Sequence, residues 1–140
     1  MDAILPLHQL EILRDDESFW NARDAANTEL KPKGLYLTHL FTEEDVFLRP
    51  NWFEFRVKVP VVLKHLSLFR PGTLDLILTK MMRDDSIDLG DIQFLLSQEP
   101  ITEQELRQAF AQARIPDVQE FRDIFRAVQP KVLALAAKHS

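Results

Sequence analysis

The stretch Leu74–Leu96, LDLILTKMMRDDSIDLGDIQFLL, decides the second half of the fold. Its apolar residues at 74, 77, 78, 81 and 82 have the i, i+3, i+4, i+7, i+8 spacing of one buried helix face. Lys80 lies beside that face, so its stem can rest on apolar surface while its ammonium reaches solvent. After an acidic turn, Asp88 and Asp91 stand one helical turn apart. The stretch predicts two consecutive helices that bring a cation and two carboxylates together.

These three charged residues have two interpretations. A lysine late in one helix and aspartates early in the next complement the helix dipoles, and this makes an ordinary solvated junction. The same groups can also hold a phosphate and its metal ion. Spacing alone favours the ordinary junction.

Length and composition predict one domain that covers residues 1–140, with a mixed part at 1–70 and a helical part at 71–140. The net charge of −5 and the scattered cations argue against non-specific DNA binding. The absence of cysteine excludes disulfides and thiolate metal sites. No apolar run approaches the roughly 20 residues of a membrane helix, and no signal-peptide pattern is present, so we expect a cytoplasmic protein that does not contact membranes.

The first half has the pattern of a small sheet with one helix. Asp15 or Asp16 can cap a helix that runs to about Leu30. Strands are expected at Leu35–Phe41 and at Phe53–Val59, where alternation predicts that the side chains at 53, 55, 57 and 59 point inward. A third strand is expected at Val61–Phe69.

The second half is predicted to be helical throughout. Thr102 and Glu105 form a capping box, and Asp117–Glu120 repeats that pattern. Pro130 is expected to break the helix that follows, with a last helix at about Lys131–Lys138. The predicted fold class is therefore α/β (α+β): a small mixed sheet with flanking helices and a helical C-terminal half.

Several kinds of chemistry have no support in the sequence. The histidines at 8, 39, 65 and 139 form no zinc-binding pair, and there is no Gly-x-Ser-x-Gly elbow or glycine-rich phosphate loop. The segment from Asp84 fails as a calcium loop because its glycine falls at position 7 and its position 12 is Leu95.

The segment from about Pro71 to Leu96 resembles the C-terminal signature of minimal nucleotidyltransferases of the abortive-infection and toxin–antitoxin type and their uncharacterised bacterial relatives. The resemblance rests on a proline, an apolar stretch, Lys80, a polar turn and then Asp-Leu-x-Asp-Ile-x-x-Leu-Leu. The segment Lys33–Phe41, KGLYLTHLF, looks like a strand of one uncharacterised branch of that superfamily.

The resemblance implies transfer of a nucleotidyl group from a nucleoside triphosphate to RNA, protein or a small molecule, with Mg²⁺ as cofactor. Lys80 matches the lysine that contacts the phosphates, and Asp88 or Asp91 matches the late acid of the site. Asp2, followed by Ala-Ile-Leu, matches the second aspartate of the metal pair. Asp2, Lys80 and Asp91 are thus the expected catalytic residues, with Lys80 and Asp88 binding the nucleotide and Asp2 the metal.

The chain departs from the family pattern at its start, because no Gly-Ser turn precedes Asp2. We therefore expect an N-terminally incomplete, inactive domain. An uncovered sheet edge and uncovered helix faces would favour homo-oligomers. The alternative function is a non-catalytic interaction module that binds an antitoxin or another protein partner.

Overall fold

The computed structural model describes residues 3–36, 40–62, 64 and 67–138. The fold is mixed α/β, and the C-terminal half is helical, as the sequence predicts. The chain divides into two compact units, Met1–Asp45 and Val46–Ser140. The sequence-based division falls later, near residue 70, because it follows the change from strand-like to helical pattern.

The first unit pairs two short strands in parallel. Strand β1 (Ala3–Leu5) aligns with β2 (Leu40–Thr42), so that Ala3 lies opposite Leu40. Helices α1 (Leu7–Leu13) and α2 (Glu17–Leu30) connect the strands, followed by a 3-10 helix at Lys31–Lys33.

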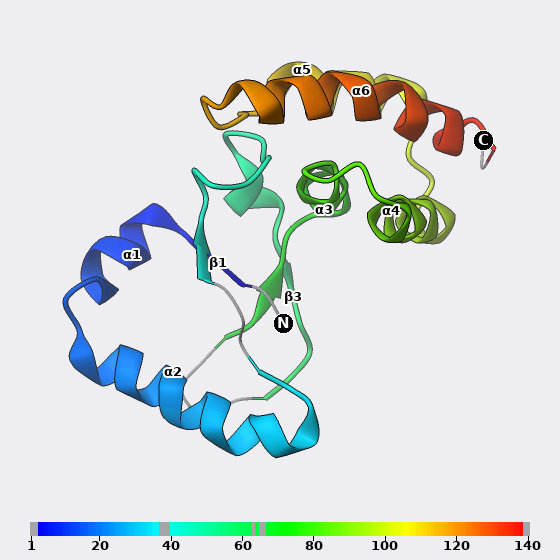
Figure 1. The fold of residues 1–140 in the computed structure, drawn as a ribbon. Helices are drawn as coiled ribbons and strands as arrows, with labels where there is room; N and C mark the ends of the chain where they lie inside the picture. The colour runs from blue at the N-terminus through cyan, green and yellow to red at the C-terminus, as the bar shows by residue number, and fades with distance from the viewer. Residues whose placement is uncertain (1–2, 37–39, 63, 65–66, 139–140) are drawn as a thin grey trace. The chain divides into compact units, whose positions relative to one another are not determined.

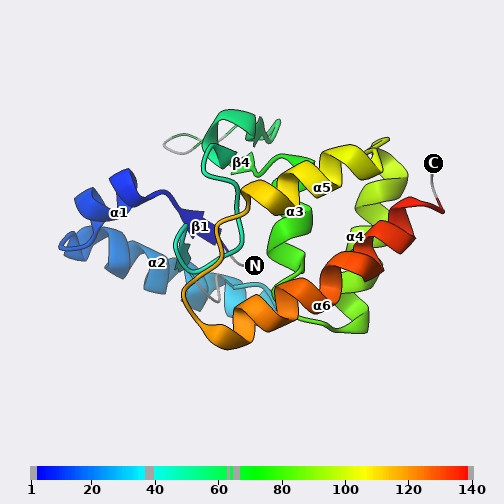
Figure 2. The ribbon, with the colours of Figure 1, turned by 90° about the horizontal axis from the view of Figure 1, so that it is seen from above.

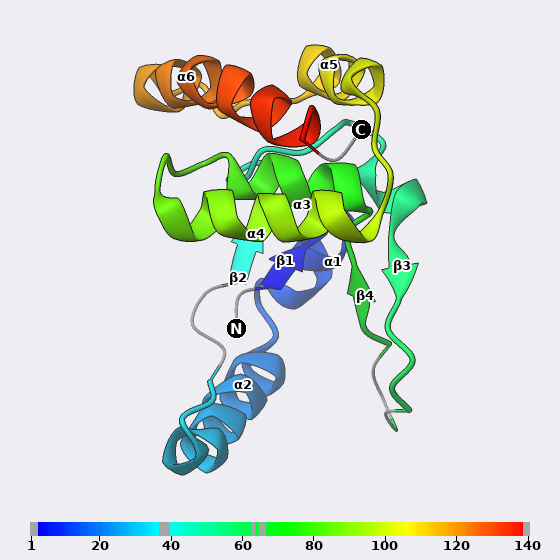
Figure 3. The ribbon, with the colours of Figure 1, turned by 90° about the vertical axis from the view of Figure 1, so that its right-hand side faces the viewer.

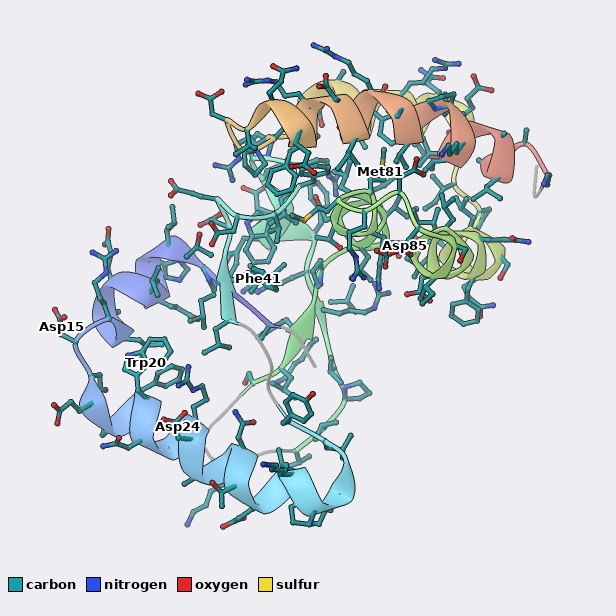
Figure 4. All side chains as sticks on the ribbon, in the orientation of Figure 1. Asp15, Trp20, Asp24, Phe41, Met81 and Asp85 are labelled. Atoms are coloured by element: carbon teal, nitrogen blue, oxygen red, sulfur yellow. The ribbon has the colours of Figure 1, made fainter. Side chains whose placement is uncertain are left out.

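Of the two aspartates predicted as the N-cap of α2, Asp16 has this role in the structure. The side chain of Asp16 accepts hydrogen bonds from the backbone N–H groups of Ser18 and Phe19 in the first turn of the helix. Trp20 lies between α1 and α2 (Figure 4), and its indole N–H donates to the Leu13 carbonyl at 3.0 Å. The sequence did not predict α1.

The second unit is built from two layers of helices and a hairpin. In Figures 1 and 2, α5 and α6 run side by side across the layer formed by α3 and α4. The hairpin of β3 and β4 extends from these layers (Figure 3). The elements are a 3-10 helix (Trp52–Phe55), β3 (Val57–Lys58), β4 (Phe69–Arg70), α3 (Thr73–Lys80), α4 (Ser86–Gln98), α5 (Glu103–Gln112) and α6 (Gln119–Ala136).

The core of this unit confirms the apolar stripe of the opening stretch. Leu78 and Met81 are fully buried, and Leu74 and Met82 pack against the core at its edge. The remaining buried apolar side chains come from α3 itself, from the segment before the 3-10 helix, and from α4, α5 and α6. These include Phe47, Ile77, Ile92, Leu96, Leu106, Phe110, Phe125, Val128, Val132 and Ala136.

The predicted strand at Phe53–Val59 is wrong over most of its length. Trp52–Phe55 forms a 3-10 helix, and the strand that follows is only Val57–Lys58. The expected inward face is not buried, since Phe55 and Val57 are 48% and 44% exposed. Trp52 is buried instead, and the Arg56 guanidinium lies over the Phe53 and Phe69 rings. The burial of Trp52 and the contact of Arg56 with the distant Phe69 outweigh the local alternation.

The other two predicted strands are also shorter than expected. Val61–Phe69 contributes only Phe69 to β4, while Val61 and Val62 are exposed; residues 63, 65 and 66 lie outside the described residues. Of Leu35–Phe41, only the last two residues belong to β2, and residues 37–39, including His39, are likewise not described.

Two predictions for the end of the chain are wrong, whereas the Thr102–Glu105 capping box is present. Helix α6 begins at Gln119 and has no side-chain cap, because Asp117 pairs instead with Arg122. Pro130 lies inside α6 and does not end it. Buried side chains on both sides of Pro130, at Val128 and Val132, hold the helix together across the missing hydrogen bond.

Candidate functional site

The charged residues of the opening stretch come together at the junction of α3 and α4. The Lys80 ammonium lies 2.7 Å from the Asp91 carboxylate and 3.2 Å from that of Asp88. The structure therefore brings together the three predicted residues of the second half. Asp2, the fourth predicted site residue, lies outside the described residues.

The end of α3 and the N-cap of α4 position this cluster. Lys80 is the last residue of α3, and Met81 follows as its C-cap. Asp85 caps α4 by accepting a hydrogen bond from the Asp88 backbone N–H at 2.8 Å. Figure 4 labels Met81 and Asp85 at the two ends of the connecting turn. Because the turn is short, the first turn of α4 lies against the end of α3, where a cation is favoured.

Arg83 is a member of the cluster that the sequence analysis missed. Its Nε lies 2.8 Å from Asp88 and 3.5 Å from Asp85. A cation within a turn between Lys80 and two aspartates is a signal that could have identified it. Asp88 thus receives hydrogen bonds from two cations, one on each of its carboxylate oxygens.

Burial separates the roles of the two aspartates. The Asp88 side chain is 3% exposed, whereas the side chains of Asp91 and Lys80 are 49% and 36% exposed. Asp88 is therefore an internal counter-ion that orients Lys80, and Asp91 is the carboxylate that solvent and ligands can reach. Of the three N–H donors of the Lys80 ammonium, two have these carboxylates as partners.

The pKa shifts agree with this geometry. Burial by itself raises the pKa of Asp88, but hydrogen bonds and charge from Arg83 and Lys80 outweigh it, and the net shift is downward. The hydrogen bond to Asp91 raises the pKa of Lys80, burial opposes it, and Asp88 adds to the rise. Both pKa shifts favour the charged forms of Lys80 and Asp88.

The described residues do not fit a Mg²⁺ ion. Among them, no group of three or more His, Asp or Glu side chains is arranged to hold a metal. Asp88 is occupied on both oxygens by cations, and a carboxylate bound in this way is a poor ligand for Mg²⁺. The proposed role of this cluster therefore involves its own charged side chains and no metal ion.

The comparisons with known proteins give no relative. No protein-family model, curated protein or solved structure matches this chain. Within the described part of the chain, no helix combines the length and apolar character needed to cross a membrane.

Proposed function

We propose that the chain is a nucleotidyltransferase-like protein and that the cluster around Lys80 binds the phosphates of a nucleoside triphosphate. The supporting observation is the convergence of Lys80 with Asp88 and Asp91, the residues that the family resemblance matches to the phosphate-binding lysine and the late acid.

The cluster can exchange one of its partners for a phosphate. Asp88 stays in place because it is buried and also bound by Arg83, so Lys80 keeps one fixed counter-ion. Asp91 is half exposed, so it can turn to solvent while a phosphate oxygen takes its place at the ammonium. In this proposal Asp88 is a positioning residue, and Lys80 and Asp91 form the accessible part of the site.

Calorimetric titration of the full chain with ATP tests this function. Lys80→Met removes a charged hydrogen-bond donor and should weaken ATP binding by about 10-fold or more. Lys131→Met is the matched control. The Lys131 side chain is 47% exposed, and it pairs with Asp84, which lies in the turn between α3 and α4. This control should bind ATP within about twofold of the parent chain, as expected for a screened charge. Equal affinities for the parent and Lys80→Met would refute the proposal.

The hairpin supports a second candidate, an interaction module that binds another copy of the chain. Residues 50–70 hold four Lys or Arg and one Glu, a net charge of +3, whereas the whole chain has −5, leaving −8 for the remainder. The same segment exposes large apolar side chains, and the basic hairpin is complementary in charge to the acidic surface of a second copy. The exposed residues are Phe55, Val57, Val61, Val62, Leu68 and Phe69.

Light scattering tests this second function. We expect dimers or larger species at low salt that dissociate at 1 M NaCl, because screening weakens contacts between exposed charges. Lys58→Glu, at an exposed position of strand β3, should also favour the monomer. A species near 16.3 kDa at all salt and protein concentrations would refute it.

A further inference from the structure

Helix α4 carries apolar side chains on two faces. Its core face includes the buried Ile92 and Leu96. On the opposite face, Ile87 is 74% exposed and Phe94 is 62% exposed. A surface helix with only a core to cover would be polar on its outer face, so packing does not account for these two residues.

A glycine leaves open space between these exposed residues. Gly90 lies three residues after Ile87 and four before Phe94, so the three positions are neighbours on the helix surface. A Cβ at Gly90 would meet no atom within 4 Å. Because glycine is less favourable than alanine inside a helix, and nothing here requires its small size for packing, the open space is available to a ligand.

This apolar surface borders the charged cluster. Asp91 follows Gly90 directly and lies one turn before Phe94. The Asp91 carboxylate in turn lies 2.7 Å from the Lys80 ammonium. The exposed Phe94 ring thus lies one helical turn from the carboxylate that contacts the partly exposed Lys80 ammonium, which suits a ligand that has a flat ring at one end and negative charge at the other.

We propose that Phe94 is the stacking platform for the base of the nucleoside triphosphate, with Gly90 leaving room for the base and Ile87 flanking it. The inference rests on the proposed function of Lys80. Because every base has a face that can stack, Phe94 provides affinity with little selection among the four bases.

Titrations of the full chain with ATP and with inorganic triphosphate, at equal Mg²⁺ concentration, separate the base from the phosphates. Phe94→Ala should weaken ATP binding by about 5- to 150-fold, the range expected for loss of one base–aromatic stack, and leave triphosphate binding unchanged. Phe94→Tyr, which keeps the ring, should bind ATP like the parent. Val118→Ala is the control, since Val118 is an exposed apolar residue, 46% exposed, just before α6.

The outcomes distinguish this inference from the function on which it rests. If ATP and triphosphate bind the parent equally well, or if Phe94→Ala binds ATP normally, the stacking role is refuted and the phosphate site remains. If neither ligand binds the parent, both proposals are refuted. If Phe94→Ala changes only the oligomeric state, the exposed face of α4 is a protein contact and the stacking role is again refuted.

Discussion

Arg49 and Asp75 form a buried bidentate ion pair that joins the segment before the hairpin to α3. Arg49 Nη2 lies 2.7 Å and Nε 3.2 Å from the two Asp75 oxygens, and the Arg49 backbone N–H donates to Asp75 at 3.0 Å. The Asp75 carboxylate therefore satisfies three donors, and the Arg49 guanidinium also lies over the Phe55 ring. This pair fixes where the hairpin leaves the helical layers.

Removal of this carboxylate should destabilise the second unit strongly. Asp75 is 0% exposed, so Asp75→Ala leaves the Arg49 charge without its partner and should lower the free energy of unfolding by about 3–5 kcal/mol. Urea denaturation followed by circular dichroism measures the change. Glu103→Ala, which breaks an exposed pair with Arg107, should cost no more than about 1 kcal/mol. Similar losses for the two variants would show that the Arg49–Asp75 pair does not have this role.

The cap assignments can be tested as a pair. Thr102→Ala removes a side chain that accepts a hydrogen bond from the Glu105 backbone N–H, and should cost about 0.5–2 kcal/mol. Asp117→Ala removes only an exposed ion pair and should cost under about 1 kcal/mol. The same denaturation series applies, and a larger loss for Asp117→Ala would restore Asp117 as the cap of α6.

Replacing Pro130 tests the continuity of α6. Pro130 is exposed inside the helix, so Pro130→Ala supplies a missing N–H and should raise the free energy of unfolding, by up to about 3 kcal/mol. The shift of the thermal midpoint measures it. A lower midpoint for Pro130→Ala would indicate that the helix ends at the proline.

The pH dependence of stability should report the Asp88 ion pairs. The folded-state pKa of Asp88 is lowered, so its contribution is present above its unfolded pKa of about 4 and is lost as the pH falls through the folded value. Asp88→Asn should therefore lose less stability than the parent chain between about pH 5 and about pH 2, in urea titrations at each pH. Parallel losses in the two proteins would mean that Asp88 does not stabilise the fold through its charge.

The sequence predicts the elements whose signals are local. The stripe through Leu78, the Asp16 cap and the Thr102 box need only neighbours within two helical turns, and all three are present. The convergence of Lys80 with Asp88 and Asp91 follows from the short turn between two predicted helices.

The features that the sequence does not predict depend on distant contacts. Asp75 lies 26 positions from Arg49, and no spacing rule links them. The alternation at Phe53–Val59 is that of a strand, but the burial of Trp52 and the stacking of Arg56 on Phe53 and Phe69 select a 3-10 turn. Pro130 is tolerated inside α6 because the packing of the helix on both sides of the proline outweighs the free-energy cost of a proline in a helix interior.

Mapping the amide resonances of the full ¹⁵N-labelled chain during titration with ATP tests whether the cluster of Lys80, Asp88 and Asp91 binds nucleotide phosphates. We expect saturable shifts from the end of α3 through Phe94 of α4, present in Lys131→Met and lost in Lys80→Met. No shifts at the α3–α4 junction, or the same shifts in Lys80→Met as in the parent chain, would contradict this binding role and leave the cluster as an ordinary helix junction.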